Sequence, residues 1–210
     1  MGIQEILKRA VWGQLGRPSG LRGRVIGQLM TAHNAAAHDL TLSHAGLEPN
    51  NRVLEVGFGA STLAEKALRA TSGVTVRGID ASEVMVERAN EHNAEAVREI
   101  RAELRLGSIS SLPYPAESFE KALSVHSIYF WPDPIADLGE VLRVLVSGGR
   151  FVVTIDPSEP LEDPMVRRTG HKTWSREALL AVLEEAGLVA KGSESRQDLG
   201  LVCAWGHKRS

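Results

Sequence analysis

The sequence has one cysteine in 210 residues, so the chain cannot form an internal disulfide. That residue, Cys203, lies in the apolar segment 201–205, which is typical of a β-strand, and we expect it to pack in the core. No uninterrupted apolar run approaches the roughly 20 residues that a membrane span needs. Residues 1–10 show neither a signal-peptide apolar stretch nor the Ser or Thr of a myristoylation motif. These absences predict a cytoplasmic protein with no stable membrane insertion.

Motifs for metal binding are also missing. There is no HExxH, no paired CxxC and no cluster of Asp, Glu and His at metal-ligand spacing, so we predict no metal site. The net charge of -2 gives no overall attraction to nucleic acid, and we expect no nucleic acid partner. Residues 1–24 carry five basic side chains and one acidic side chain. Such an excess is usually a solvated helix face, with an anionic substrate or a membrane surface as the alternative.

From Arg52 onward, short β-branched runs alternate with amphipathic stretches. This alternation is typical of βαβ units around a parallel sheet. The expected strands are residues 53–56, 74–79, 103–106, 121–125, 150–155, 188–193 and 199–206. The expected helices are residues 20–40, 61–70, 82–96, 134–145 and 175–186. No helix separates the last two strands, so we expect them to pair antiparallel.

We therefore predict an α/β fold of the Rossmann-like kind. Its doubly wound, mostly parallel seven-stranded sheet would carry an antiparallel strand pair at the C-terminal end. Residues 51–210 would form this domain, and residues 1–50 would be a helical segment that acts as a lid over the bound ligand. Residues 157–173, rich in Pro, Asp, Glu and Arg, are expected to form a loop.

The clearest chemical signal is a carboxylate and two glycines, Glu55, Gly57 and Gly59, between the first strand and the next helix. Glycines allow positive φ and close backbone approach, and a helix start presents unpaired N–H groups to a ligand. Asp80 follows 21 positions after Gly59, where a carboxylate can accept hydrogen bonds from both hydroxyls of a ribose. These features indicate an adenosine ligand. Dinucleotide-binding enzymes share them, but their third glycine would stand at Thr62.

Four segments occur together in the order of a known family. They are residues 53–61, residues 78–82 with Met85, residues 112–115 with 118–120, and residues 142–145 with 148–150. In this order they resemble the class I S-adenosylmethionine-dependent methyltransferases, in the small-molecule group with ubiquinone and sterol methyltransferase relatives. The resemblance covers residues 50–155 of the chain.

By this resemblance, the cofactor is S-adenosylmethionine and the product is S-adenosylhomocysteine. Glu55, Gly57 and Gly59 would surround its methionine part, with Glu55 reaching the ammonium group. Phe58 would pack the loop against the cofactor, and Asp80 would hold the ribose.

The resemblance also implies residues that line the adenine. They are Ala81, Ser82, Met85, Ser108 and Ile109. Ser108 departs from the family, which usually has an Asp that accepts a hydrogen bond from the adenine amino group. A hydroxyl can still accept that bond.

The methyl group would move by in-line displacement to a small-molecule acceptor, and the sequence leaves the acceptor atom open among O, N, C and S. Orientation is the main task of the protein because the sulfonium carries its own leaving group. Where the acceptor must lose a proton, His126, after the expected strand 121–125, is the first candidate base. The alternative is a histidine bonded to backbone at a strand end. Residues 124–127 lack the Asn/Asp-Pro-Pro-aromatic motif that resembles methyltransferases of nucleic acid bases.

Other candidates for substrate contact are aromatic residues and histidines. Tyr129 and Trp131 would shape an acceptor pocket, or would pack in the core. His33 and His38 would reach the site if the N-terminal helix is a lid, although exposed polar residues are the commoner case. His171, in the loop after the fifth strand, is a further candidate.

Two other functions remain open. A non-catalytic protein that binds S-adenosylmethionine or S-adenosylhomocysteine is favoured by Ser108 in place of the acid. An NAD-type oxidoreductase is favoured by the glycines and Asp80, and opposed by Glu55 and the missing third glycine. The sequence does not predict an oligomeric state.

Overall fold

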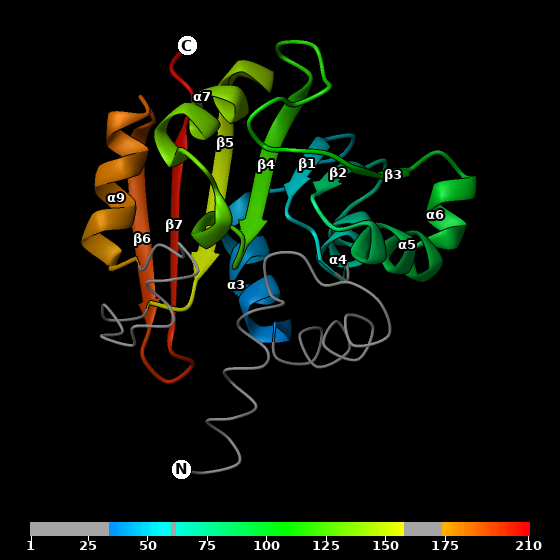
Figure 1. Cartoon of the computed structure of the whole chain (residues 1–210), viewed down its shortest axis with the longest axis horizontal. Helices are drawn as coiled ribbons and strands as arrows, with labels where there is room; N and C mark the ends of the chain where they lie inside the picture. Colours follow the sequence, from blue (N-terminus) through cyan, green and yellow to red (C-terminus); the bar gives the residue numbers. More distant parts are fainter. Residues whose placement is uncertain (1–33, 60–61, 158–173) are drawn as a thin grey trace.

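The chain folds around one sheet with the strand order β3-β2-β1-β4-β5-β7-β6 (Figure 1). The structure is a computed structural model, and it describes residues 34–59, 62–157 and 174–210. The strands are β1 (Arg52–Val56), β2 (Thr75–Asp80), β3 (Ala102–Leu106), β4 (Phe119–Val125), β5 (Leu145–Ile155), β6 (Val189–Arg196) and β7 (Leu201–His207). The helices are α3 (Ala35–Ala45), α4 (Thr62–Ala70), α5 (Glu83–His92), α6 (Ala94–Arg98), α7 (Pro134–Val144) and α9 (Arg176–Glu185), with a 3-10 turn η1 (Ile128–Phe130).

The first five strands are parallel, and the last two complete the sheet in an antiparallel arrangement. β1 pairs with β2 and β4, while β3 and β5 extend the sheet on either side. β7 lies between β5 and β6 and is antiparallel to both. The predicted mostly parallel seven-stranded sheet with an antiparallel C-terminal pair is therefore confirmed. Strand order reverses between β1 and β4, the kind of switch point where doubly wound sheets bind ligands beyond their carboxyl ends.

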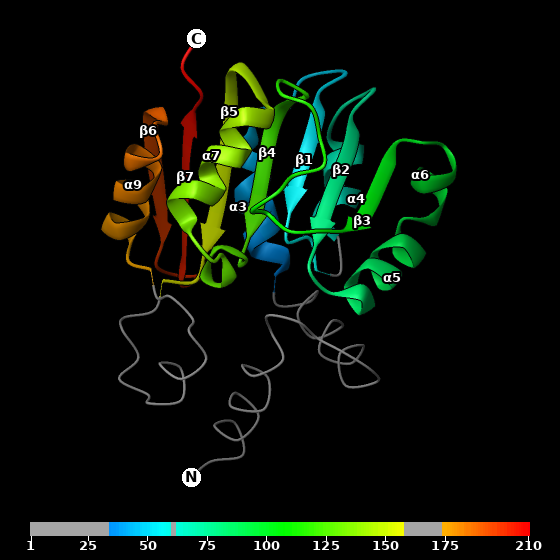
Figure 2. The same cartoon turned by 45° about the horizontal axis from the view of Figure 1, so that its top comes forward.

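Helices cover both faces of the sheet (Figure 2). Successive strand residues point to opposite faces, so one strand can contribute to two hydrophobic clusters. Leu54 and Val56 of β1 pack in the cluster that contains the buried side chains of α7 and α9. Val53 belongs instead to the cluster that contains those of α3 and α4. The buried core is thus divided into two layers by the sheet.

Three helices begin at N-terminal capping residues that can be recognised in the sequence. Ser82, Asp133 and Ser175 each precede a helix, and their side chains accept hydrogen bonds from N–H groups of the first turn. Pro134 occupies the first turn of α7, where its missing N–H is not needed. These caps account for the agreement between the expected and observed starts of α5, α7 and α9.

The helix expected over residues 82–96 is two helices in the structure. Asn93 lies between α5 and α6, and both its backbone N–H and its side-chain amide donate to the carbonyl of Ala89, at 3.0 and 2.9 Å. Local side-chain bonds of this kind compete with the helical ladder. The helical pattern therefore breaks at Asn93.

The bounds expected for the N-terminal helix, residues 20–40, differ from those of α3. The described part begins at Asn34, and α3 continues beyond residue 40 to Ala45. It ends there because Gly46 takes φ 58°, the left-handed conformation that closes many helices.

The helix α3 packs directly on the sheet. Its Thr41 shares a 2.7 Å hydrogen bond with Thr154 of β5, and both side chains are fully buried. The described part of the N-terminal segment is therefore a core helix, and the lid role expected for that segment stays a prediction for residues 1–33, outside the described residues. No helix in the described ranges has both the length and the apolar character of a membrane span.

Candidate active site

The two carboxylates singled out in the sequence stand at one edge of the sheet. Glu55 is next to last in β1 and Asp80 is last in β2. Val56 pairs with Ile79 in parallel register, so both carboxylates lie at the carboxyl ends of neighbouring strands. Glu55 shares a face of the sheet with Val53, two residues earlier, which packs with α3 and α4. The Glu55 side chain is therefore directed toward these helices.

The glycine turn after β1 needs glycine for two different reasons. Gly57 and Gly59 have φ of 69° and 53°, a region that residues with side chains rarely adopt. A Cβ at Gly57 would lie 2.3 Å from Cβ of Ser127, so the backbone there passes too close for any side chain. A Cβ at Gly59 would meet no atom of the described residues within 4 Å. No described residue therefore fills the space beside Gly59.

Asp80 braces this turn. Its Oδ2 accepts the N–H of Gly59 at 2.9 Å, and its Oδ1 accepts the N–H of Ser82 at 2.9 Å. Burial raises the pKa of Asp80, and these backbone hydrogen bonds oppose that rise. Each carboxylate oxygen has two acceptor positions. Asp80 can therefore keep its two backbone hydrogen bonds and still accept hydrogen bonds from the hydroxyl groups of a ribose.

Glu55 is buried with an unsatisfied oxygen. The residue is 4% exposed, and Oε2 has no hydrogen-bond partner among the described residues. Burial raises the pKa of Glu55 well above its ordinary value, the charge of Asp80 raises it further, and a hydrogen bond from the N–H of Ala64 lowers it in part. An unsatisfied buried group costs roughly 1–3 kcal/mol, and more when it is charged. An ammonium group would supply the missing partner, so the site fits a ligand that is positively charged at this point.

The residues expected at an adenine come from two neighbouring strand ends. Ser82 and Met85, after β2, are buried, while Ala81 is exposed. Ile109 is buried and Ser108 is exposed, and both follow β3. β2 and β3 are paired in parallel, so the structure brings these residues to the same edge as the two carboxylates.

Phe58 fixes the glycine turn to the sheet. Its ring is buried against Ala89 of α5 and Leu104 of β3. A Cβ at Gly78 would lie 2.7 Å from the ring, so this glycine of β2 makes room for it. The side chain therefore packs the loop, and its expected contact with the cofactor stays a prediction.

His126 follows β4 in a strained conformation. Its φ is 51°, and its N–H donates to the carbonyl of Thr154 at 2.9 Å. Its ring is nearly parallel to that of Tyr129, at 12° and with 6.3 Å between the ring centroids. Non-glycine residues in the left-handed region cost of order 1–3 kcal/mol and cluster at functional sites. The structure thus holds His126 at the end of the strand that neighbours β1.

Tyr129 and Trp131 are tied to the protein interior. The hydroxyl of Tyr129 donates to the carbonyl of Asp156 at 2.9 Å and accepts its N–H at 2.7 Å. Trp131 is buried, and its Nε1 donates to Oγ of Ser127 at 3.2 Å. Burial also raises the pKa of Tyr129. These contacts favour the core roles that the sequence left open, and acceptor contacts by the two residues stay predictions.

Sequence reasoning missed Ser127. Its Oγ donates to the carbonyl of Val56 at 3.0 Å and lies 2.7 Å from Oγ of Ser124. Because a hydroxyl has one proton, Ser124 is the donor in the second contact. Ser127 thereby ties the end of β4 to the end of β1, directly before Gly57. No motif marks such a serine, and only the close approach at Gly57 reveals it.

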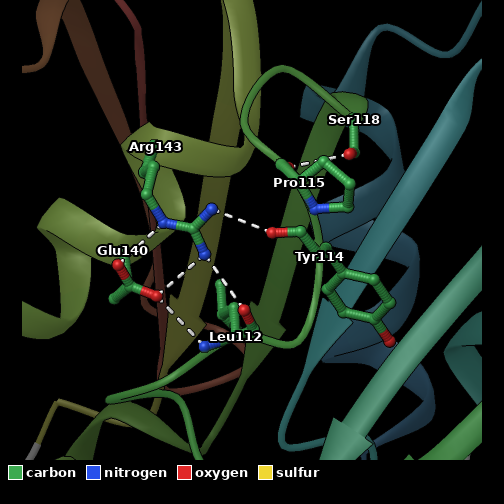
Figure 3. Close-up of polar contacts among 6 residues, drawn as sticks. All are labelled: Leu112, Tyr114, Pro115, Ser118, Glu140 and Arg143. Atoms are coloured by element: carbon green, nitrogen blue, oxygen red, sulfur yellow. Dashed lines mark hydrogen bonds and ion pairs between the residues drawn. The ribbon is translucent and has the colours of Figure 1, made fainter.

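The loop between β3 and β4 is held by a salt bridge on α7 (Figure 3). The guanidinium of Arg143 donates to the carbonyls of Tyr114 and Leu112, at 2.8 and 3.0 Å. Glu140 pairs with Arg143 at 2.9 Å and accepts the N–H of Leu112 at 3.1 Å. Two of the recognised segments, residues 112–115 and 142–145, therefore meet in space. Their contact fixes the loop that begins with the residues expected at the adenine.

Two candidate histidines, His33 and His171, lie outside the described residues and stay predictions. His38 is described, and the interpretation of it as an exposed polar residue is wrong, because it is 7% exposed. Its Nδ1 lies 2.9 Å from Oγ1 of Thr62. Burial and the charge of Lys66 lower its pKa to about 4, so the ring is neutral at pH 7.

Within the described ranges, no group of three or more His, Cys, Asp or Glu is placed to hold a metal ion.

Known proteins resemble the chain in sequence and fold. A family model described as a methyltransferase domain matches residues 54–153. The uncharacterized methyltransferase YdaC of Bacillus subtilis is 31% identical over 140 residues, covering 67% of this chain and 75% of that protein. The 24-methylenesterol C-methyltransferase 2 of Oryza sativa subsp. japonica is 34% identical over 142 residues, covering 67% of this chain and 38% of that protein. A crystal structure of an S-adenosylmethionine-dependent methyltransferase from Aquifex aeolicus has a TM-score of 0.68 at 19% identity, covering 81% of this chain and 89% of that one.

The sheet order and the carboxylate-lined glycine turn at its switch point define a class of α/β enzymes with Rossmann-like topology. The chain belongs to the class I S-adenosylmethionine-dependent methyltransferase family, in the group that includes sterol and ubiquinone methyltransferases.

Proposed function

We propose that this enzyme transfers the methyl group of S-adenosylmethionine to a small-molecule acceptor. The observation that carries the proposal is the buried, unsatisfied Oε2 of Glu55 beside the glycine turn and Asp80. S-Adenosylmethionine has an ammonium group and a ribose diol, which match these two carboxylates in charge and in hydrogen bonding. When bound, this cofactor supplies a methyl group on a positively charged sulfur that is its own leaving group.

The residues of the chain bind and orient the reactants. Glu55 accepts hydrogen bonds from the ammonium group, and Asp80 accepts them from the ribose while it holds the N–H of Gly59. The buried side chains of Met85 and Ile109 offer apolar surface to the adenine. Fixing the reacting atoms in line contributes several kcal/mol, up to about 7–11 in ideal systems.

On the acceptor side, His126 is the proposed base. Its strained backbone and its parallel stacking on Tyr129 support a fixed position at the end of β4, next to β1 in the sheet. A neutral imidazole accepts a proton near pH 7, as an acceptor with an O–H or N–H group requires. An acceptor carbon or sulfur that has already lost its proton would not need this base.

The names of relatives support a small-molecule acceptor. They include a sterol C-methyltransferase, a 27-O-demethylrifamycin SV methyltransferase and a ubiquinone/menaquinone C-methyltransferase. The matches cover 38%, 61% and 45% of these three proteins. The proposal therefore extends to a small-molecule acceptor and not to the particular substrates of these relatives.

Calorimetric titration with S-adenosylmethionine and S-adenosylhomocysteine, with NAD as the control, tests the proposal. We expect micromolar binding of the first two, and at least tenfold weaker binding by Asp80→Ala, because a charge-assisted hydrogen bond contributes about 1.5–3 kcal/mol. A folded protein that binds NAD instead, or binds none of the three, would refute the cofactor assignment. Binding with no turnover across a broad panel of acceptors would favour the non-catalytic alternative.

A further inference from the structure

The loop between β3 and β4, residues 107–118, lies along α7 and is bonded to it at intervals. Residues three or four apart on a helix share one face, so a single face of α7 can follow a neighbouring segment over several turns. The loop and the helix run in the same direction, because later residues of one bond to later residues of the other. From the start of the loop onward, Ser110, Leu112 and Tyr114 bond to Asp137, Glu140 and Arg143 in turn.

Asp137 is the buried member of this series. The residue is 1% exposed, whereas the side chains of Glu140 and Arg143 are 27% and 37% exposed. Oδ1 of Asp137 accepts the hydroxyl of Ser110 at 2.7 Å, and Oδ2 accepts the N–H of Asp133 at 3.1 Å. Both carboxylate oxygens therefore have a partner, and the two partners come from different segments of the chain.

These two partners belong to the two sides of the candidate site. Ser110 directly follows Ser108 and Ile109, the residues expected at the adenine, and its N–H donates to Oγ of Ser108 at 3.3 Å. Asp133 ends the segment after β4, residues 126–133, which begins with the proposed base. Hydrogen bonds to a buried carboxylate are costly to break. A shift of the loop that leaves the segment in place is therefore unfavourable.

A second contact joins the same segment to β1. Ser127, near the start of the segment, bonds to the carbonyl of Val56, whereas Asp133 stands at the end of the segment. A response that passes through Ser127 would be centred on residues 126–128, and one that passes through Asp137 on residues 133–137. The two routes can therefore be distinguished along the chain.

We propose that Asp137 is a positioning residue for methyl transfer. It holds the loop that lines the adenine in a fixed relation to the segment that carries His126, so that binding of the cofactor orders the acceptor side. This inference rests on the proposed function, in which the adenosine part of the cofactor lies against the loop. The competing explanation is that the carboxylate of Asp137 only closes the first turn of α7, as side chains in capping boxes do.

Hydrogen exchange of the whole wild-type protein, with and without saturating S-adenosylhomocysteine, measures this coupling peptide by peptide. We expect slower exchange at the glycine turn, residues 55–59, and in residues 107–112. We also expect exchange in residues 133–137 to slow about fivefold or more, the lower end of typical coupling between sites. Protection at the glycine turn with none in residues 133–137 would overturn the inference.

Two substitutions separate the coupling from the cap of α7. Ser110→Ala removes the bond to the loop and leaves the bond between Asp137 and Asp133. S-Adenosylhomocysteine should then still protect the glycine turn but slow residues 133–137 by less than about twofold, because the coupling is lost. Full protection of residues 133–137 in Ser110→Ala would leave Asp137 with a capping role only.

The conservative variant is Asp137→Asn, which keeps both bonds without the charge. Its amide oxygen can accept the N–H of Asp133, and its amide N–H can donate to the hydroxyl of Ser110. We expect the exchange of residues 133–137 to respond to S-adenosylhomocysteine as in the wild-type protein. Loss of the response in this variant would refute coupling through these two bonds.

The matched control is Ser118→Ala, at the other end of the same loop (Figure 3). The hydroxyl of Ser118 donates to the carbonyl of Pro115 at 2.8 Å, a bond within the loop and not to α7. We expect the response of residues 133–137 to stay at the wild-type level. A loss equal to that in Ser110→Ala would assign the response to general loosening of the loop. The proposed function fails separately, when the folded wild-type protein binds no S-adenosylhomocysteine and no peptide changes its exchange, and the inference then falls with it.

Discussion

The ends of β1 and β4 are neighbours in the sheet, but their buried polar groups differ in hydrogen bonding. At β1, Oε2 of Glu55 is buried and has no partner among the described residues. After β4, the hydroxyls of Ser127 and Tyr129 bond to backbone groups of other segments, and the indole of Trp131 bonds to Ser127. The end of β1 thus has an unpaired polar group among the described residues, whereas these groups after β4 are paired.

This difference separates binding from positioning. Buried polar groups in proteins are nearly always paired, so the unpaired carboxylate oxygen beside the glycine turn is where we expect a charged ligand group to bind. A satisfied network is rigid and fixes the geometry around it. We therefore expect the end of β1 to provide affinity for a charged group and the end of β4 to provide a fixed support beside it. Ser127 joins the two through the carbonyl of Val56.

The largest effect should come from pushing these two ends apart. Gly57→Ala places a Cβ 2.3 Å from Cβ of Ser127 at a φ of 69°. We expect a loss of about 3 kcal/mol or more in the free energy of unfolding, from backbone strain and overpacking together. Denaturant unfolding measures it. The matched control is Gly59→Ala, with φ 53° but no described atom within 4 Å, which should cost about 1–2 kcal/mol. Equal losses would contradict the contact with Ser127.

The second prediction removes the buried charge at the end of β1 by the substitution Glu55→Gln. Glu55→Gln should weaken S-adenosylhomocysteine binding about 10–100-fold, because a hydrogen bond to a charged group is lost. The same change should stabilise the ligand-free protein at neutral and higher pH. The raised pKa of Glu55 gives stability that is present below its ordinary value of 4.5 and is lost as pH rises through the raised pKa.

Melting temperatures of the ligand-free wild-type protein and Glu55→Gln, measured from pH 4 to pH 9, test this second effect. The curves should lie close together at the acidic end and separate as pH rises, with the variant more stable. Parallel curves would show that Glu55 does not have a raised pKa in the folded protein.

The complete network after β4 should respond in stability and not in affinity. Tyr129→Phe removes the hydroxyl that bonds to both backbone groups of Asp156, and we expect a loss of about 1–2 kcal/mol. Binding of S-adenosylhomocysteine should stay within twofold. Tyr114→Phe is the control, because that hydroxyl is buried without a partner among the described residues and its removal should cost nothing. Tenfold weaker binding in Tyr129→Phe would end the division between binding and positioning.

The smallest stability effect is expected at His126. Glycine adopts φ 51° without strain, but it adds entropy to the unfolded chain, so His126→Gly should change the free energy of unfolding by less than about 1 kcal/mol. Ile100→Gly, at φ 60° and far out in solvent, is the control for backbone relief. Affinity for S-adenosylhomocysteine should not change, whereas turnover of an acceptor that must lose a proton should fall. Unchanged turnover of such an acceptor would remove His126 from the role of base.

Much of the fold follows from the sequence because buried strands appear as short apolar runs. The main error is in β5, which begins at Leu145 and not at residue 150. Gly148 and Gly149 are typical of a turn, and Gly148 does take φ 72°, but the strand continues through them. The pairing of Leu145 with Phe119 across an irregular register explains this, and no local pattern encodes it.

The candidate site divides in the same way. Glu55, Gly57 and Asp80 are recognisable because the strand, turn and helix that place them are continuous in the chain. Ser127 is not, because it contacts a residue 71 positions away. His38 is a candidate in the sequence, but its contact with Thr62, 24 positions away, is not predicted. Contacts at such separations depend on how the helices and strands pack. Sequence reasoning therefore identifies the glycine turn and misses the long-range contacts that support it.

The place of β7 has a consequence for how the protein is made. Among the described strands β7 comes last in the chain, yet it lies inside the sheet, paired on both sides. During synthesis, β5 has an open edge until residues 201–207 leave the ribosome, and β6 cannot join the sheet before then. Unpaired apolar edges of this kind are prone to aggregation. We therefore expect the nascent chain to be prone to aggregation until β7 is inserted between β5 and β6.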